Sequence, residues 1–171
     1  MRIILIALTI NLIISFDLNA KIASVIGNPV NGDIYFNVNK DTKNYPASLT
    51  KMMTLYIIFD ELKNNKISKE DKVVFSHNAA SQQPSRINIP AGKSINVDEI
   101  ILGLIIKSGN DAAVAIAEKI SGTEKKFVKL MNVYAQRINM KNTNFANPNG
   151  LPNRSNISSA HDMFLLGSAI Y

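Results

Sequence analysis

Apolar residues recur along this chain at spacings that predict a short hairpin followed mostly by helices. The segments 22–27 and 34–38 are rich in β-branched and aromatic residues, and the turn-forming segment 28–33 lies between them, a pattern typical of a β-hairpin. Apolar residues then recur at helical spacing over 49–62, which predicts a helix that begins near Ser48. Because this helix is apolar on nearly every side, we expect it at the centre of the fold.

The rest of the chain predicts one more strand and several helices with recognisable ends. A short strand is expected over 72–75. Asn96 with Glu99 has the spacing of a capping box, and Gly122 is a helix stop signal. We expect helices over 97–106, 111–120 and 123–139, and a last one that begins at 159–162 and runs to the end of the chain. This order of elements predicts an α/β fold.

The first twenty residues differ from the rest. A cationic start precedes the apolar run 3–16, which is shorter than the roughly 20 residues that span a bilayer and is typical of a secretory signal peptide. We expect residues 1–20 to be a signal peptide cleaved after Ala20, and residues 21–171 to be exported. A buried N-terminal element and an uncleaved membrane anchor are the alternatives.

Composition narrows the class of protein. The 171 residues are enough for one domain, and 46% of them are hydrophobic, with 8 Gly and 6 Pro; disordered and collagen-like proteins are excluded. The absence of Cys excludes disulfide scaffolds, thiolate metal sites and cysteine nucleophiles. With only two His, a multi-histidine metal centre is disfavoured, and we expect no metal cofactor.

The net charge of +6 comes from 19 basic and 13 acidic residues. Nucleic acid is one partner that a basic chain suggests. The lysines are scattered, however, and no basic run is interleaved with aromatic residues, so we expect a solvated surface and no nucleic-acid partner. Attraction to an anionic membrane surface or wall polymer is the functional alternative.

Ser48 and Lys51 are spaced so that one could activate the other. Residues at i and i+3 share a helix face, with Cβ atoms about 5–6 Å apart. A serine hydroxyl is a weak nucleophile unless a neighbouring base takes its proton, and a lysine can be that base when its pKa is depressed. The alternative is a capping serine beside a surface lysine; its weakness is that Lys51 lies in the most apolar helix of the chain.

A second polar cluster is Ser108-Gly109-Asn110, between two apolar helices. The pattern S-x-N also occurs at 76–78 and 94–96, but only Ser108 stands where two buried helices are expected to converge. A helix-to-helix turn in which Asn110 is a cap is the alternative interpretation.

With these motifs in place, the sequence resembles the D-alanyl-D-alanine carboxypeptidase family, the low-molecular-weight penicillin-binding proteins that act as serine peptidases of peptidoglycan. The resemblance runs from about residue 22 to residue 171 and rests on motifs in a specific order. They are Tyr45-Pro46-Ala47-Ser48-Leu49-Thr50-Lys51, Ile89-Pro90-Ala91-Gly92, Lys107-Ser108-Gly109-Asn110-Asp111, Asn142-Thr143-Asn144-Phe145 and Asn147-Pro148-Asn149-Gly150-Leu151.

The resemblance implies a penicillin-binding protein and β-lactamase-like serine acyl-transferase fold, and roles for four residues. Ser48 would be the nucleophile that becomes an acyl-ester, with Lys51 as its proton acceptor. Ser108 would pass protons to the leaving amine and back from water, and Asn110 would contact the substrate backbone.

The same resemblance implies what the protein acts on and where. The substrate would be a peptidoglycan muropeptide ending in D-Ala-D-Ala, from which the terminal D-Ala is removed, and β-lactam antibiotics would be trapped as slow acyl-enzymes. No metal or organic cofactor is implied. The location would be the periplasm or the extracytoplasmic face of the cell membrane.

One departure from the family concerns its third motif, Lys-Thr-Gly on a later strand. Lys107-Ser108-Gly109 is similar but overlaps the second motif. We therefore expect residues 21–171 to be a C-terminally incomplete catalytic domain that lacks the later strands of the sheet. A non-catalytic fragment and a class A-like β-lactamase are the rival hypotheses. A phosphate-binding loop at 92–94 is excluded because its first Gly would fall at Ile87.

Overall fold

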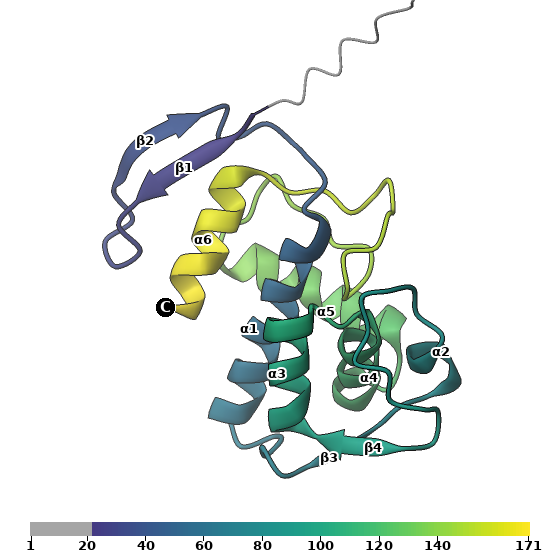
Figure 1. Ribbon diagram of the computed structural model, residues 1–171. Coiled ribbons are helices and arrows are strands. Elements are labelled where there is room, and N and C mark those ends of the chain that lie inside the picture. The colour runs from purple at the N-terminus through teal and green to yellow at the C-terminus, as the bar shows by residue number, and fades with distance from the viewer. Residues whose placement is uncertain (1–21) are drawn as a thin grey trace, which may run out of the picture.

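A computed structural model describes residues 22–171, in which a hairpin lies beside a group of helices (Figure 1). The expected signal peptide, 1–20, lies outside the described residues. The strands are β1 (Ser24–Gly27), β2 (Ile34–Val38), β3 (Lys72–Val74) and β4 (Ser94–Asn96). The helices are the 3₁₀ turn η1 (Ala47–Leu49) and α1 (Thr50–Lys63), α2 (His77–Ala80), α3 (Val97–Lys107), α4 (Asn110–Ser121), α5 (Glu124–Arg137) and α6 (Ala160–Ile170).

The strands form two separate antiparallel pairs. β1 pairs with β2, with Ser24 opposite Val38, which confirms the predicted hairpin. β3 pairs with β4, with Val73 opposite Ile95, so the strand expected over 72–75 is present. β4 and the short helix α2 were not predicted, because three or four residues are too few to show a period. The mixture of helix and strand confirms the α/β class.

Helix α1 lies at the centre of the helices, as its all-round apolarity predicts (Figure 1). On one side, Ile58 belongs to a buried cluster with Phe75 and Ile100. On the other side, Met53 and Ile57 belong to a second cluster that α5 and α6 complete. Since both clusters need α1, its apolar residues cannot be confined to one stripe.

The ends of the helices follow the signals in the sequence. The Asn96 backbone N–H donates to the Glu99 carboxylate at 2.8 Å, which is one half of the capping box at the start of α3. Helix α4 ends at Gly122, whose φ of +76° is left-handed. The next residue, Thr123, caps α5 by accepting the Lys126 N–H at 3.2 Å.

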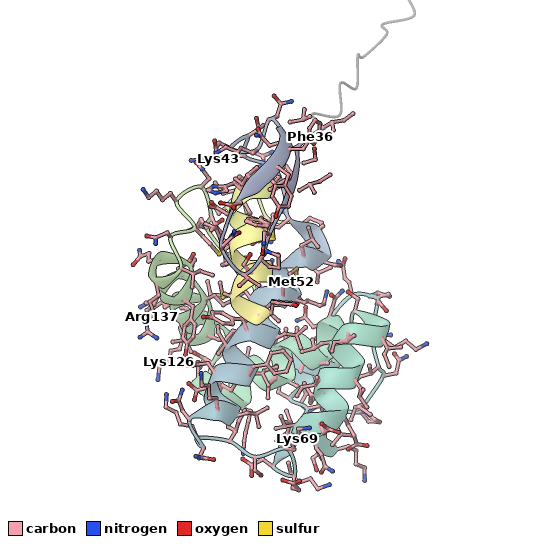
Figure 2. All side chains as sticks on the ribbon, turned by 90° about the vertical axis from the view of Figure 1, so that its left-hand side faces the viewer. Phe36, Lys43, Met52, Lys69, Lys126 and Arg137 are labelled. Carbon is pink, nitrogen blue, oxygen red and sulfur yellow. The ribbon has the colours of Figure 1, made fainter. Side chains whose placement is uncertain are left out.

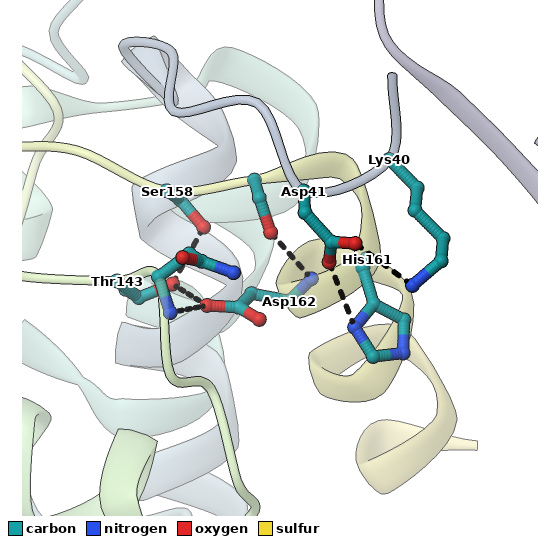
Figure 3. Close-up of polar contacts among 8 residues, drawn as sticks. Lys40, Asp41, Thr143, Ser158, His161 and Asp162 are labelled. Atoms are coloured by element: carbon teal, nitrogen blue, oxygen red, sulfur yellow. Dashed lines mark hydrogen bonds and ion pairs between the residues drawn. The ribbon is translucent and has the colours of Figure 1, made fainter. Parts of the chain in front are cut away.

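A buried carboxylate fixes the start of α6 against the loop that follows α5 (Figure 3). Asp162 accepts hydrogen bonds from the Asn142 N–H and the Thr143 hydroxyl, both at 2.7 Å. Its neighbour His161 lies 3.6 Å from the carboxylate of Asp41, which follows the hairpin. These contacts hold the start of α6 to the loop after α5 and to the segment after the hairpin.

The charged side chains are distributed over many elements. Figure 2 shows Lys43, Lys69, Lys126 and Arg137 on different parts of the chain. Across residues 22–171, none of the helices combines the length and apolarity that a membrane span needs.

Candidate active site

Ser48 lies in the tight turn that leads into α1. This turn, η1, follows the buried Pro46, and Ala47 within it has a left-handed φ of +48°. Non-glycine residues adopt that conformation only at a cost, and such residues are common at functional sites. Neither η1 nor α1 has a side-chain cap, so the alternative in which Ser48 is a helix cap is wrong. The serine is exposed.

Lys51, one turn further on, is buried. It is only 3% exposed, so the alternative of a surface lysine is also wrong. Its Nζ donates a hydrogen bond of 2.6 Å to the backbone carbonyl of Asn149, rather than to Ser48. Burial lowers the pKa of Lys51 to about 8, because the ammonium loses hydration. More of this amine is therefore neutral near physiological pH than in an exposed lysine, and the neutral form can accept a proton.

Ser108 meets the first two residues in one hollow. It ends α3 with left-handed dihedrals (φ 52°, ψ 41°), and this bend turns the chain back towards α1. Ser48, Lys51 and Ser108 line the same hollow of about 420 Å³, whose walls include the apolar Leu55 and Leu104. Three of the four residues expected at the site are therefore together, and two serine hydroxyls and a buried amine share one apolar-walled space.

Asn110 is placed differently. It is the first residue of α4, is 5% exposed and does not line that hollow. Its Nδ2 donates to the carbonyl of Gln83 at 2.9 Å, and its backbone N–H donates to that of Ser85 at 2.7 Å. The amide thus binds the loop between α2 and β4, and the expected contact with a substrate stays a prediction.

Asp111 binds the same loop through its carboxylate. This carboxylate is fully buried and accepts the backbone N–H groups of Ile87 and Asn88 at 2.9–3.1 Å and that of Ala112 at 2.9 Å. A buried carboxylate needs such donors to replace its lost hydration. Asp111 therefore fixes the loop to the start of α4, next to Ser108 and Asn110.

The segment 148–150 is bound to α1 beside Lys51, a contact that sequence reasoning missed. Along α1, Thr54 donates to the carbonyl of Pro148 at 2.7 Å and Lys51 to that of Asn149. Gly150 has a φ of +82°, and a Cβ there would overlap the carbonyl oxygen of Ala47. The motif Asn147-Pro148-Asn149-Gly150 marked this segment as a loop, but backbone acceptors leave no signature in a sequence.

The described residues, 22–171, contain no cluster of three or more His, Asp or Glu side chains that could hold a metal ion. The chemistry that this arrangement supports is carried by hydroxyl, amine and amide groups.

Comparison with known proteins identifies where this arrangement belongs. The profile of the D-alanyl-D-alanine carboxypeptidase family matches residues 14–171. The D-alanyl-D-alanine carboxypeptidase DacF of Bacillus subtilis is 43% identical over 139 residues, which are 81% of this chain and 36% of that relative. DacA of Haemophilus influenzae is 42% identical over 142 residues, with the same coverage.

Solved structures agree with the sequence comparison. The carboxypeptidase DacD of Francisella tularensis has a TM-score of 0.85 at 42% identity, covering 90% of this chain and 37% of that one. Penicillin-binding protein 5 of H. influenzae has a TM-score of 0.83 at 40% identity, covering 86% and 44%. The chain therefore spans about a third of the length of the curated relatives that it matches, and its α/β fold is that of penicillin-binding proteins. On this evidence, the chain belongs to the D-alanyl-D-alanine carboxypeptidase family.

Proposed function

We propose that this chain supplies the nucleophile and the base of a serine-type D-Ala-D-Ala carboxypeptidase. The observation that carries the proposal is a buried lysine with a lowered pKa, one helical turn from an exposed serine in the same hollow. An amine that is partly neutral can take the proton of the serine hydroxyl as the oxygen attacks. Negative charge that develops near Ser48 is also favoured by the N-terminus of α1.

The reaction would proceed through an acyl-enzyme. The Ser48 oxygen forms a bond to the carbonyl carbon of the penultimate D-Ala, and its proton passes to Lys51. The C–N bond then breaks, and the terminal D-Ala leaves after its amine has received a proton. Water hydrolyses the ester, and this restores the free serine.

Ser108, in the hollow, and Asn110, beside it, would also serve this reaction. Ser108 lines the hollow with Ser48 and Lys51, and its hydroxyl would pass protons between the amine and the leaving group. Asn110 uses its Nδ2 on the Gln83 carbonyl. That bond leaves its Oδ1 as the atom with which the side chain would accept a substrate N–H.

The substrate would be a peptidoglycan stem that ends in D-Ala-D-Ala, and β-lactams would acylate the same serine. Two observations support this part: the relatives are named D-alanyl-D-alanine carboxypeptidases, and a structural neighbour is named a penicillin-binding protein. Because peptidoglycan is assembled outside the cytoplasm, the protein would act after export, at the extracytoplasmic face of the membrane or in the periplasm.

Covalent labelling tests the proposal. We expect a fluorescent penicillin to label the protein at Ser48, and Ser48→Ala to abolish the label. Lys51→Ala should reduce labelling by about 10²-fold or more, because the hydroxyl loses its base. Lys63→Ala, at the exposed end of the same helix, and Ser94→Ala, in another S-x-N triplet, should label like the unaltered protein.

The lifetime of the label and the release of D-Ala separate the alternatives. A long-lived acyl-enzyme together with D-Ala release from diacetyl-Lys-D-Ala-D-Ala supports a carboxypeptidase, whereas rapid penicillin turnover indicates a β-lactamase. Label that persists in Ser48→Ala would contradict the assignment of the nucleophile. A folded protein that takes no label at all would favour the non-catalytic alternative.

A further inference from the structure

A chain of side-chain contacts leads from the loop after α2 to the base of the proposed site. Gln82, half-buried in that loop, accepts a hydrogen bond from Nδ2 of Asn149 through its Oε1, at 3.0 Å. The other end of the Gln82 amide donates to the Asn78 carbonyl in α2, at 3.2 Å. The Gln82 amide is therefore anchored to α2 through its nitrogen and directs its oxygen towards Asn149.

Asn149 uses three of its polar groups at once. Its side chain donates to Gln82, its Oδ1 accepts the Leu151 N–H at 3.0 Å, and its backbone carbonyl accepts the Lys51 ammonium. The residue is 2% exposed, so water cannot replace a lost partner. The direction of its carbonyl is thus set by what its side chain binds.

We propose that Gln82 is a positioning residue for Lys51, acting through Asn149. The inference rests on the proposed function, in which Lys51 is the base. Gln82 fixes the Asn149 side chain, and this fixes the peptide whose carbonyl holds Nζ. A general base needs its atom within hydrogen-bond reach of the proton that it takes. The hydrogen bond to Asn149 sets where the amine rests before it turns to Ser48.

Loss of the Gln82 side chain should disturb the position of Lys51 more than the stability of the fold. Without an acceptor, the buried Nδ2 of Asn149 is left unpaired, and the side chain is driven to rotate towards another partner. The adjacent peptide remains attached to α1, because Thr54 still donates to the Pro148 carbonyl. Misplacement of a catalytic group by about 1 Å can cost up to 10²-fold in rate, so we expect a loss between about tenfold and 10²-fold.

A matched pair of substitutions isolates the hydrogen bond. Gln82→Met keeps the length of the side chain and removes the acceptor, whereas Gln82→Glu keeps an acceptor oxygen. Stopped-flow acylation by a fluorescent penicillin separates initial binding from the acylation step. Gln82→Met should slow the acylation step by about tenfold or more with binding unchanged, and Gln82→Glu should restore most of that rate. Gln136→Ala, an exposed glutamine of α5, is the control for a glutamine substitution elsewhere.

Two results would overturn the inference while the proposed function stands. One is acylation at the unaltered rate in Gln82→Met; the other is an equal loss in Gln82→Met and Gln82→Glu. A double-mutant cycle adds a further condition: in an Asn149→Ala background, Gln82→Met should have no further effect, because the two residues act in series. Additive losses would show that Gln82 acts by another route.

A measurement that needs no catalysis distinguishes failure of the inference from failure of the proposed function. The Leu151 N–H is held by the Asn149 side chain, whereas the Ile157 N–H is held by the Asn144 backbone at 2.9 Å. Gln82→Met should speed amide hydrogen exchange at Leu151 at least tenfold and leave Ile157 unchanged. Unchanged exchange at Leu151 would contradict the inference whether or not the protein is acylated.

Discussion

The ammonium of Lys51 donates to the backbone carbonyl of Asn149, a residue 98 positions later in the chain, at 2.6 Å. The bond joins the first turn of α1 to the loop after α5. A carbonyl oxygen can only accept, so this bond uses one N–H of Lys51 and holds Nζ beside the loop.

Acylation of Ser48 should depend on pH with a midpoint near 8. Burial lowers the pKa of Lys51 from the ordinary 10.5 to about 8, so the neutral amine that can accept a proton predominates above pH 8. The acylation rate should rise about tenfold per pH unit below that value and level off above it. Rates measured from pH 5.5 to 10 test this; a midpoint near 10.5, or a flat profile, would contradict the role of Lys51.

Gly150→Ala should be far more damaging than Gly122→Ala. Both glycines have a left-handed φ, but a Cβ at Gly150 would overlap the Ala47 carbonyl, while the space around Gly122 is open. Backbone strain alone costs about 1–2 kcal/mol of unfolding free energy, and we expect that loss at Gly122. The overlap at Gly150 should raise the loss above about 3 kcal/mol.

Urea unfolding measures both variants, and the same samples can be acylated by a penicillin. Equal losses of stability in Gly150→Ala and Gly122→Ala would contradict this prediction. They would show that the loop can move away from Ala47 to accommodate a Cβ at little cost.

Asp111→Asn should loosen the loop beneath the site. An asparagine has one acceptor oxygen, and its NH₂ would face backbone donors that now point at a carboxylate. Because charge-assisted bonds are each worth about 1.5–3 kcal/mol, we expect a loss of about 2–4 kcal/mol and faster hydrogen exchange at Ile87 and Asn88. Asp98→Asn, on the exposed first turn of α3, should cost about 0.5 kcal/mol. Similar costs at the two sites would refute the structural role of Asp111.

Thr54→Val should weaken the contact between α1 and the segment 148–150. Valine has nearly the shape of threonine but leaves the Pro148 carbonyl without its buried donor, at a cost of about 1–2 kcal/mol. Thr54→Ser keeps the hydroxyl and should retain the bond, apart from a small cavity effect. The comparison is by urea unfolding; a serine variant no more stable than the valine variant would show that the hydroxyl contributes little.

Much of the fold could be predicted from the sequence where apolar residues are many and regularly spaced. The central place of α1 follows from its all-round apolarity, and the start of α3 follows from Asn96 and Glu99. The pairing of β3 with β4 could not be predicted in the same way. Each strand has three residues, which are too few to show a period. Which strand pairs with which therefore depends on the folded chain rather than on the sequence of either strand.

The candidate site divides along a similar line. Ser48, Lys51 and Ser108 could be predicted as candidates, because a serine and a lysine at i and i+3 and a serine between two apolar helices are visible in the sequence. The partners of Lys51, Thr54 and Asn110 are backbone carbonyls of Asn149, Pro148 and Gln83. Every residue has such a carbonyl, so only the folded chain shows which one is used.

The separation in sequence between α1 and the segment 148–150 has a consequence for the growing chain. A ribosome that adds about 5–20 residues per second needs roughly 5–20 s to pass from Lys51 to Asn149. The second cluster of α1 is also completed late, because Phe127 and Phe145 are synthesised long after α1 and Leu166 only after Asn149. A chain whose translation stops before Asn149 would therefore contain Ser48 and Lys51 but not the carbonyl that binds the lysine.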